Sequence, residues 1–253
     1  MKLNKENKRL GIVLLLLMTT CFSNASEICQ EQVGQMMIIR HEHPPASIVG
    51  GVILFKNDFK GLVGIDDVYA KTSQLQEGRK IPLFIAIDQE GGWVQRLKPE
   101  HGYTEIPSHK EIGEGEQLES FKWGLRTAAE LRAGGINLNF GVVLDDNSNP
   151  DNPVIGKYER SLGTDIEKVA KWGLELTEGS LVNDVLPTIK HFPGHGDTST
   201  DSHYGLAVVN KTMEELEQIE LAPFSRVLGN AVVPPAVMMG HLSLPKVLGG
   251  NLP

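Results

Sequence analysis

Six short apolar runs, each followed by a longer stretch of mixed polar and apolar residues, constrain the fold of this chain more than any other feature. The runs lie near residues 36–39, 52–55, 81–87, 136–144, 185–189 and 237–240. They lack polar/apolar alternation, which is typical of strands covered on both faces in parallel sheets. The pattern predicts an α/β fold, a (β/α)8 barrel of the TIM type that is incomplete, with about six of its eight strands present.

The stretches between the runs carry helix signals. Apolar residues repeat at helical spacing over 118–131, and Gly134-Gly135 marks the end of that helix. Thr164 and Thr212 are each followed three residues later by a glutamate, the spacing of a capping box, so each predicts a helix start. The second of these helices is expected to be broken at Pro223.

Residues 1–25 have the pattern of a cleavable secretory signal. Basic residues precede the apolar run Leu10–Met18, and small residues end the segment at Ala25. The run is too short for a membrane span. We therefore expect cleavage after Ala25 and a secreted or periplasmic bacterial protein that does not associate with a membrane. Lipidation of Cys21 is an alternative, although Thr20 is a poor residue before a lipidated cysteine.

Charge and cysteine content narrow the class of protein further. The chain has a net charge of −8, which becomes −11 without residues 1–25, because that segment holds four basic residues and one acidic residue. Such an acidic protein is a poor partner for nucleic acid. Cys29 would then be the sole cysteine, so no internal disulfide is expected, which is compatible with a periplasm.

The segment from Lys190 to His203 is the densest in reactive side chains, with three histidines, two aspartates and a lysine. Pro193, Gly194 and Gly196 interrupt regular structure, so the segment is expected to form a loop at the carboxyl end of the preceding strand. Reacting groups of parallel α/β proteins lie at that end.

Three interpretations of this segment stay open from spacing alone. The first is a metal site formed by His191, His195, Asp197, Asp201 and His203, although the spacing fits no familiar zinc pattern. The second is a polar loop whose histidines only bond to neighbouring residues. The third is acid/base catalysis, in which Asp201 accepts a ring N–H of His203 and leaves the second ring nitrogen free to transfer a proton.

Three motifs together resemble one enzyme family. Lys-His-Phe-Pro-Gly-His-Gly at 190–196, followed by Asp-Ser-His at 201–203, resembles the signature of the glycoside hydrolase family 3 β-N-acetylhexosaminidases. Residues 88–96 and 137–163 resemble the family's second and third signatures, in the family's order. The resemblance implies that residues 26–253 are the N-terminal part of this family's catalytic barrel.

The resemblance also implies roles for individual residues. His203 would be the catalytic acid/base and Asp201 the residue that orients it. The sugar-binding side chains would be Asp88, Arg96, Arg160, Lys190 and His191. No metal and no cofactor is expected. A buried Lys190 would need a ligand or a carboxylate beside it.

For several other residues the sequence predicts structural or surface positions, or leaves two roles open. Asp88 could alternatively cap the next helix. Trp93 stands where many relatives have arginine, so no contact is carried over to it. Asp145 and Asp146 are predicted to be structural carboxylates. His241 could line the pocket or pack against its neighbours. The remaining histidines outside the loop are predicted to lie on the surface, namely His41, His43, His101 and His109.

The implied activity is a retaining exo-β-N-acetylglucosaminidase acting on peptidoglycan or chitin-type oligosaccharides. The family's aspartate nucleophile would lie beyond Pro253, so at most trace activity is expected of these 253 residues alone. Alternatives are an inactive sugar-binding relative, a metal hydrolase, and transfer to phosphate instead of water. The carbohydrate is the expected partner, and the sequence does not indicate an oligomeric state.

Overall fold

The computed structural model describes residues 30–42 and 48–250. The predicted signal segment, Cys21, Cys29 and His43 lie outside the described residues. The chain divides into two compact units. One comprises residues up to Ile53 together with Gly78–Phe84, and the other comprises Leu54–Glu77 and the residues from Ile85 onward.

The first unit contains two paired strands. β1 (Ile38–Arg40) and β2 (Gly51–Leu54) run parallel. β3 (Phe84–Ile87) begins here, where the Phe84 amide donates to the Gly50 carbonyl at 2.9 Å. The run at 81–87 thus becomes a strand three residues later than expected.

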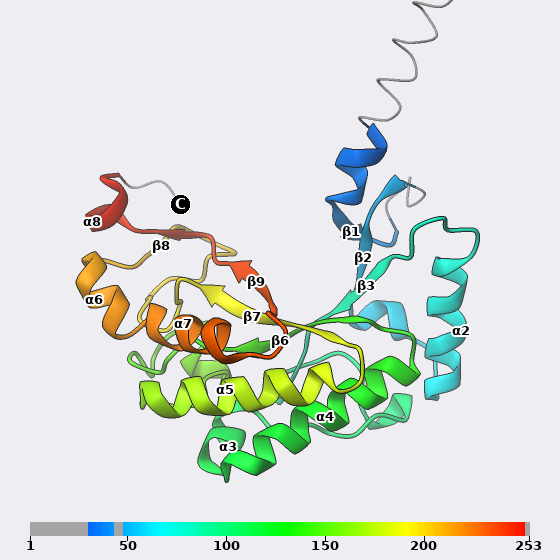
Figure 1. Cartoon of the computed structure of the whole chain (residues 1–253), viewed down its shortest axis with the longest axis horizontal. Coiled ribbons are helices and arrows are strands. Elements are labelled where there is room, and N and C mark those ends of the chain that lie inside the picture. The colour runs from blue at the N-terminus through cyan, green and yellow to red at the C-terminus, as the bar shows by residue number, and fades with distance from the viewer. Residues whose placement is uncertain (1–29, 43–47, 251–253) are drawn as a thin grey trace, which may run out of the picture. The chain divides into compact units, whose positions relative to one another are not determined.

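The second unit contains the remaining strands of the sheet. β3 is followed in the sheet by β6 (Leu138–Val143), β7 (Leu186–Phe192) and β9 (Ala236–Met239), each pair parallel. The complete order is β1-β2-β3-β6-β7-β9 (Figure 1). Because the strands follow one another in sequence order with helices between them, the predicted incomplete (β/α)8 architecture with six strands is confirmed.

Helices connect these strands. The α-helices that follow β2 are α2 (Ile65–Gln76), α3 (His109–Glu114), α4 (Gln117–Ala133), α5 (Ile166–Leu181), α6 (Met213–Gln218), α7 (Leu221–Asn230) and α8 (Pro245–Leu248). The short strands and 3-10 helices after β2 are η2 (Lys56–Phe59), β4 (Gln89–Gly91), β5 (Val94–Gln95), η3 (Pro99–His101), η4 (Gly156–Tyr158), β8 (Ala207–Val208) and β10 (Leu242–Ser243). No described helix is long and apolar enough to span a membrane.

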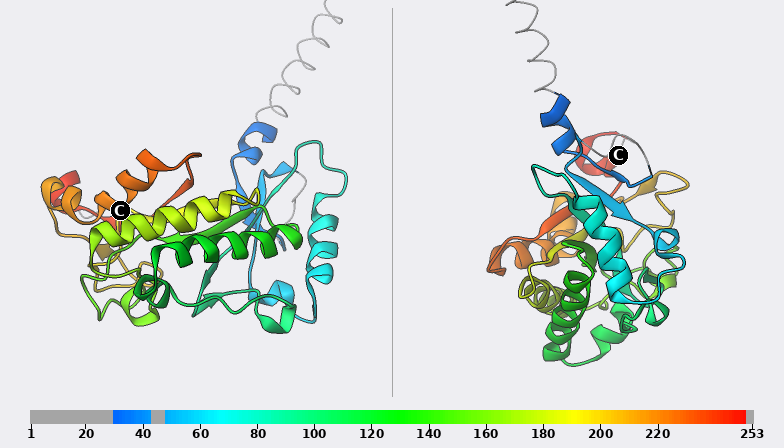
Figure 2. Two further views of the ribbon diagram at one scale, coloured as in Figure 1. Left: turned by 60° about the horizontal axis from the view of Figure 1, so that its bottom comes forward. Right: turned by 90° about the vertical axis from the view of Figure 1, so that its right-hand side faces the viewer.

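Helices α4 and α5 lie side by side (Figure 2) and approach closely at two glycines. A Cβ on Gly124 would lie 2.4 Å from the Leu176 carbonyl oxygen, and one on Gly179 would lie 2.2 Å from the Phe121 oxygen. The larger side chains of this unit fill a core between the helices and β6 and β7; it includes Val142, Leu144, Val169, Ile189 and Phe224.

Two helix boundaries differ from the sequence prediction. Helix α5 is capped by Asp165, whose Oδ1 accepts from the Glu167 and Lys168 amides, and Thr164 lies outside the cap. The chain breaks between α6 and α7 before Pro223, which lies in the first turn of α7. A proline is tolerated there because the amides of a first turn have no partner within the helix. The Thr212 and Glu215 capping box is confirmed.

Candidate active site

The predicted sugar ligands come together in one buried cluster at the carboxyl ends of β3 and β7. Arg160 donates two hydrogen bonds to the Glu90 carboxylate, from Nε and Nη2, each 2.8 Å long. Lys190 Nζ lies 2.6 Å from Glu90 Oε1 and 3.1 Å from Asp88 Oδ1. Arg96 Nη2 lies 3.2 Å from Asp88 Oδ2. The five side chains form a continuous chain of ion pairs.

The strand geometry explains why the two carboxylates meet the lysine. Asp88 follows β3 directly, and Glu90 stands two residues further, so both can point to the same side of an extended chain. Lys190 is 2% exposed on β7. The sequence predicted a carboxylate beside it, and two are present, those of Asp88 and Glu90. The alternative that Asp88 caps a helix is wrong, because the short strand β4 follows it.

Glu90 belongs to this cluster although no sequence motif predicted a role for it. Burial alone would raise the pKa of Glu90, but the charges of Lys190 and Arg160 outweigh burial and hold the pKa far below its ordinary value. The carboxylate is therefore ionised and fixes two cations at once. A signal existed in the sequence, because two buried cations, Lys190 and Arg160, require more than one carboxylate.

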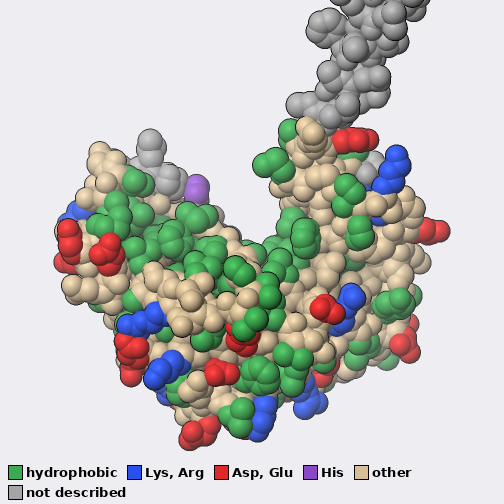
Figure 3. Space-filling model, viewed as in Figure 1, with side chains coloured by type: hydrophobic (Ala, Val, Ile, Leu, Met, Phe, Trp, Pro, Cys, Tyr) green, Lys and Arg blue, Asp and Glu red, His purple; other side chains and the backbone are tan. Residues whose placement is uncertain are grey.

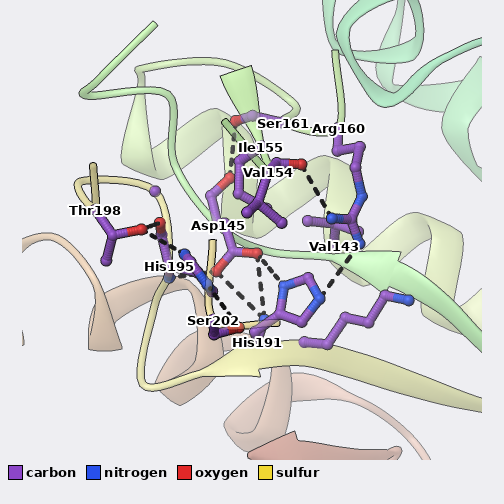
Figure 4. Close-up of polar contacts among 12 residues, drawn as sticks. Val143, Asp145, Val154, Ile155, Arg160, Ser161, His191, His195, Thr198 and Ser202 are labelled. Atoms are coloured by element: carbon purple, nitrogen blue, oxygen red, sulfur yellow. Dashed lines mark hydrogen bonds and ion pairs between the residues drawn. The ribbon is translucent and has the colours of Figure 1, made fainter. Parts of the chain in front are cut away.

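His191 occupies the far end of the cluster. Its Nδ1 lies 2.6 Å from Asp145 Oδ2, and its Nε2 lies 3.3 Å from Arg160 Nη2 (Figure 4). Burial lowers the pKa of His191, although Asp145 opposes the effect, so the ring is neutral at pH 7. The Nδ1–H is donated to Asp145, and the bare Nε2 accepts from Arg160.

Asp145 also holds the next segment of the chain. Its Oδ1 accepts the His195 amide at 2.6 Å. Burial would raise the pKa of Asp145, but the contacts with His191 and the His195 amide lower it. Asp145 thus acts as the structural carboxylate that was predicted, and it positions His191. Asp146 is also buried, and its Oδ2 accepts the Ser148 amide at 2.8 Å.

The predicted pair of Asp201 and His203 is formed. Asp201 Oδ1 lies 2.8 Å from His203 Nδ1 and accepts the His203 amide at 2.9 Å. Burial would raise the pKa of Asp201, but these two contacts lower it, so the carboxylate favours the tautomer with a proton on Nδ1. The His203 side chain is 78% exposed.

His195 connects this pair to the buried cluster. Its ring is buried, with Nδ1 2.5 Å from Thr198 Oγ1 and Nε2 3.3 Å from Ser202 Oγ (Figure 4). Ser202 stands between Asp201 and His203 in the sequence. The polar-loop interpretation therefore fits His195, whose contacts are structural.

The loop residues do not converge on one metal centre. His191 pairs with Asp145, His195 with Thr198, and His203 with Asp201, while Asp197 lies 3.3 Å from Lys211 Nζ. Within residues 30–42 and 48–250, no group of three or more potential ligands has the geometry of a metal site.

Two histidine predictions need correction. His101 and His109 are buried rather than on the surface. His101 Nδ1 accepts the Lys98 amide, and His109 Nε2 accepts the Val143 amide, each at 3.1 Å. Both rings satisfy backbone groups that would otherwise be unpaired. His241 is exposed, so it does not pack as one alternative expected, and none of the described cluster contacts involves it.

Known proteins share this architecture. Residues 28–251 match the family model described as the glycosyl hydrolase family 3 N terminal domain. A β-hexosaminidase of Xylella fastidiosa (strain M23) is 36% identical over 206 residues, which are 79% of this chain and 58% of that protein.

Solved structures agree with these sequence matches. A family 3 β-N-acetylglucosaminidase from Paenibacillus sp. str. FPU-7 aligns with a TM-score of 0.81 and 37% identity, over 88% of this chain and 44% of its own. NagZ from Neisseria gonorrhoeae, in complex with N-trifluoroacetyl-D-glucosamine, aligns with a TM-score of 0.70 and 34% identity, over 79% of this chain and 58% of its own. The chain thus spans less than two thirds of each of these proteins.

Proposed function

The chain belongs to glycoside hydrolase family 3, whose N-terminal domain it matches, and on that premise we propose that it carries the sugar pocket and the acid/base pair of a retaining exo-β-N-acetylglucosaminidase. The substrate is a terminal β-linked N-acetylglucosamine of a peptidoglycan or chitin-type oligosaccharide. The relative from Neisseria gonorrhoeae, solved with an N-acylated glucosamine, supports this class of sugar.

The observation that carries the proposal is the ion-pair chain at the strand ends. Asp88 keeps 17% of its side chain exposed, while its partner Lys190 is buried. Asp88 can therefore accept hydrogen bonds from sugar hydroxyls in a fixed orientation, and Arg96 and Arg160 can donate them. Fixed charges of this kind suit a polar, uncharged sugar ring.

The proposed chemistry proceeds in two displacements. In the first, His203 gives the proton on Nε2 to the leaving glycosidic oxygen, while an aspartate outside these residues bonds to the anomeric carbon. In the second, His203 takes a proton from water, and that water displaces the aspartate. Asp201 holds the ring in place; between the two steps the ring is neutral, with its proton on Nδ1, and it regains the Nε2 proton in the second.

Sugar binding tests the pocket directly. In calorimetric titrations, the 253-residue chain is expected to bind N-acetylglucosamine. Asp88→Asn should weaken binding roughly tenfold or more, because one charged acceptor is lost. Asp66→Asn, an exposed aspartate at the start of α2, is the matched control and should leave binding unchanged. Equal affinities of wild type and Asp88→Asn would contradict the proposed pocket.

The acid/base step requires the polypeptide encoded by the complete reading frame that contains these residues. His203→Ala is expected to lower its hydrolysis of N,N′-diacetylchitobiose by about 10²- to 10⁴-fold. A substrate whose leaving group needs no protonation should be affected less. Unchanged turnover of the disaccharide would refute the role of His203. Turnover by the 253-residue chain, lost in His203→Ala, would refute a nucleophile beyond Pro253.

A sugar-binding protein without catalysis is the second candidate, and the exposure of the His203 ring favours it. A reading frame that ends after Pro253 would bring this candidate forward.

We also propose export, with cleavage after Ala25, on the pattern of residues 1–25. Amino-terminal sequencing of the protein purified from its source tests this, and an intact Met1 would contradict it.

A further inference from the structure

An aromatic pair lies beside the ion-pair cluster. The rings of Trp93 and Tyr158 meet edge to face, with centroids 5.8 Å apart and planes at 64°. Trp93 is 70% exposed and Tyr158 is 37% exposed. Lys157 Nζ lies 5.9 Å from the centre of the Tyr158 ring. The pair is thus an exposed aromatic surface in which each ring contacts the other.

The backbone places this pair within a few residues of the ion-pair cluster. Trp93 follows Glu90 by three residues, in the turn between β4 and β5, and Tyr158 precedes Arg160 by two residues. Three residues span at most about 10 Å of extended chain. The two segments therefore meet twice, through the buried ion pair of Glu90 with Arg160 and through the two rings.

The turn that carries Trp93 is fixed. The Gly92 amide donates to the Ile106 carbonyl at 2.9 Å. Gly91 has a φ of +106°, and a Cβ there would lie 2.2 Å from the Pro107 oxygen, so only glycine fits. A ring on such a turn is preorganised for a ligand, which limits the entropy lost on binding.

We propose that Trp93, supported by Tyr158, forms a subsite for the second sugar ring of the substrate, and that this ring is a neutral N-acetylhexosamine of a chitin-type oligosaccharide. The inference rests on the proposed function and names its substrate class. A pyranose ring presents a face of C–H groups, which packs on an aromatic face. The indole itself carries no charge, so the contact that it offers is to the C–H face of the ring and not to an acidic group.

Ligand pairs that differ in one ring test the subsite in the 253-residue chain. Calorimetry should show N,N′-diacetylchitobiose binding roughly tenfold tighter than methyl N-acetyl-β-glucosaminide. In Trp93→Ala the two dissociation constants should become equal within about twofold, and Trp93→Phe should keep part of the difference. Tyr69→Ala removes an exposed aromatic ring on α2 and is the matched control, which should keep the full difference.

Tryptophan fluorescence gives a second readout that a structural role would not move. Trp123 and Trp172 are half-buried, so Trp93 is the exposed indole of the three. The disaccharide should shift the emission to the blue, and the methyl glycoside should not. The shift should be missing in Trp93→Ala.

Each other outcome overturns part of the inference. Binding of the methyl glycoside with no gain for the disaccharide would refute the subsite and leave the proposed function standing. Preference for a disaccharide whose second ring carries a carboxylate-bearing lactyl ether would refute the neutral substrate class. A full difference retained in Trp93→Ala would refute the role of that ring. Binding of neither sugar by a folded chain would overturn the proposed function as well.

Discussion

The buried cluster around Glu90 and the loop that carries His203 are built by opposite means. In the cluster, charges pair with charges out of water, and Glu90 is 1% exposed against Lys190 at 2%. In the loop, the Asp201 and His203 pair faces solvent, and His195 and Ser202 join it to the rest of the fold. Under the proposed function, sugar binding would use a preformed site, whereas proton transfer would use a group held by few contacts.

The largest change in stability is expected from removing the Glu90 carboxylate. Glu90→Ala leaves Lys190 and Arg160 buried without their shared carboxylate, which is expected to lower the free energy of unfolding by about 3–5 kcal/mol. Urea denaturation measures the loss. The matched control is Glu119→Ala, whose exposed ion pair with Lys122 should contribute less than about 1 kcal/mol. A Glu90→Ala chain as stable as the control variant would show that the cluster is not the rigid region.

The pH dependence of stability should come from the buried region. Burial lowers the pKa of His109 to about 4, although Glu90 opposes the effect. The unfolded ring has a pKa of about 6.5, so the unfolded state binds the proton more readily. Stability from this residue is complete above about pH 6.5 and is lost as the pH falls toward 4, by up to about 3 kcal/mol.

His109→Gln isolates this contribution, because the amide oxygen of Gln can still accept the Val143 N–H. Urea denaturation between pH 7 and pH 4 should show a smaller loss of stability in the variant than in the wild type. Parallel pH profiles for the two chains would contradict the prediction. Glu90 and Asp145 also have lowered pKa values and should cause a further loss at more acidic pH in both chains.

The smallest effect is expected in the loop. Ser202→Ala removes a 3.3 Å contact with His195 Nε2 and should cost about 0.5–1 kcal/mol. Hydrogen exchange should become faster in residues 199–205 and stay unchanged in β7. Ser199→Ala, exposed in the same loop, is the control and should show no change. Faster exchange in β7 would show that the two regions are not separate.

The hydrophobic runs and helix signals predicted the architecture because each is a local property of the chain. The convergence of Asp88, Arg160 and Lys190 came from the resemblance, and the structure brings these side chains together. Glu90 was missed because its environment depends on residues far along the chain, 70 positions away in the case of Arg160. The burial of His109 depends on Val143, 34 residues away, and no local pattern reports such a contact.

The exposure of side chains at the edge of the sheet also could not be predicted from the local sequence. The run at 237–240 was predicted to be a buried strand, but in β9 Val237 and Met239 are exposed. Among the described strands β9 pairs only with β7 in the main sheet. Hydrophobic side chains gather on the face of this region (Figure 3). Periodicity predicts a strand, but the neighbours of that strand decide its burial.

The double engagement of Glu90 has a consequence for how this pocket can diversify. Loss of the Glu90 charge leaves Lys190 and Arg160 without their shared carboxylate, and loss of either cation leaves Glu90 with one partner instead of two. A change of charge at one of the three positions therefore favours a compensating change at another. Trp93 needs no such compensation, because its side chain is exposed and uncharged, so its exchange leaves no buried charge without a partner. Under the proposed function, the preferred oligosaccharide can therefore change by single substitutions at Trp93, whereas the cluster proposed to bind the terminal sugar changes only by coupled substitutions.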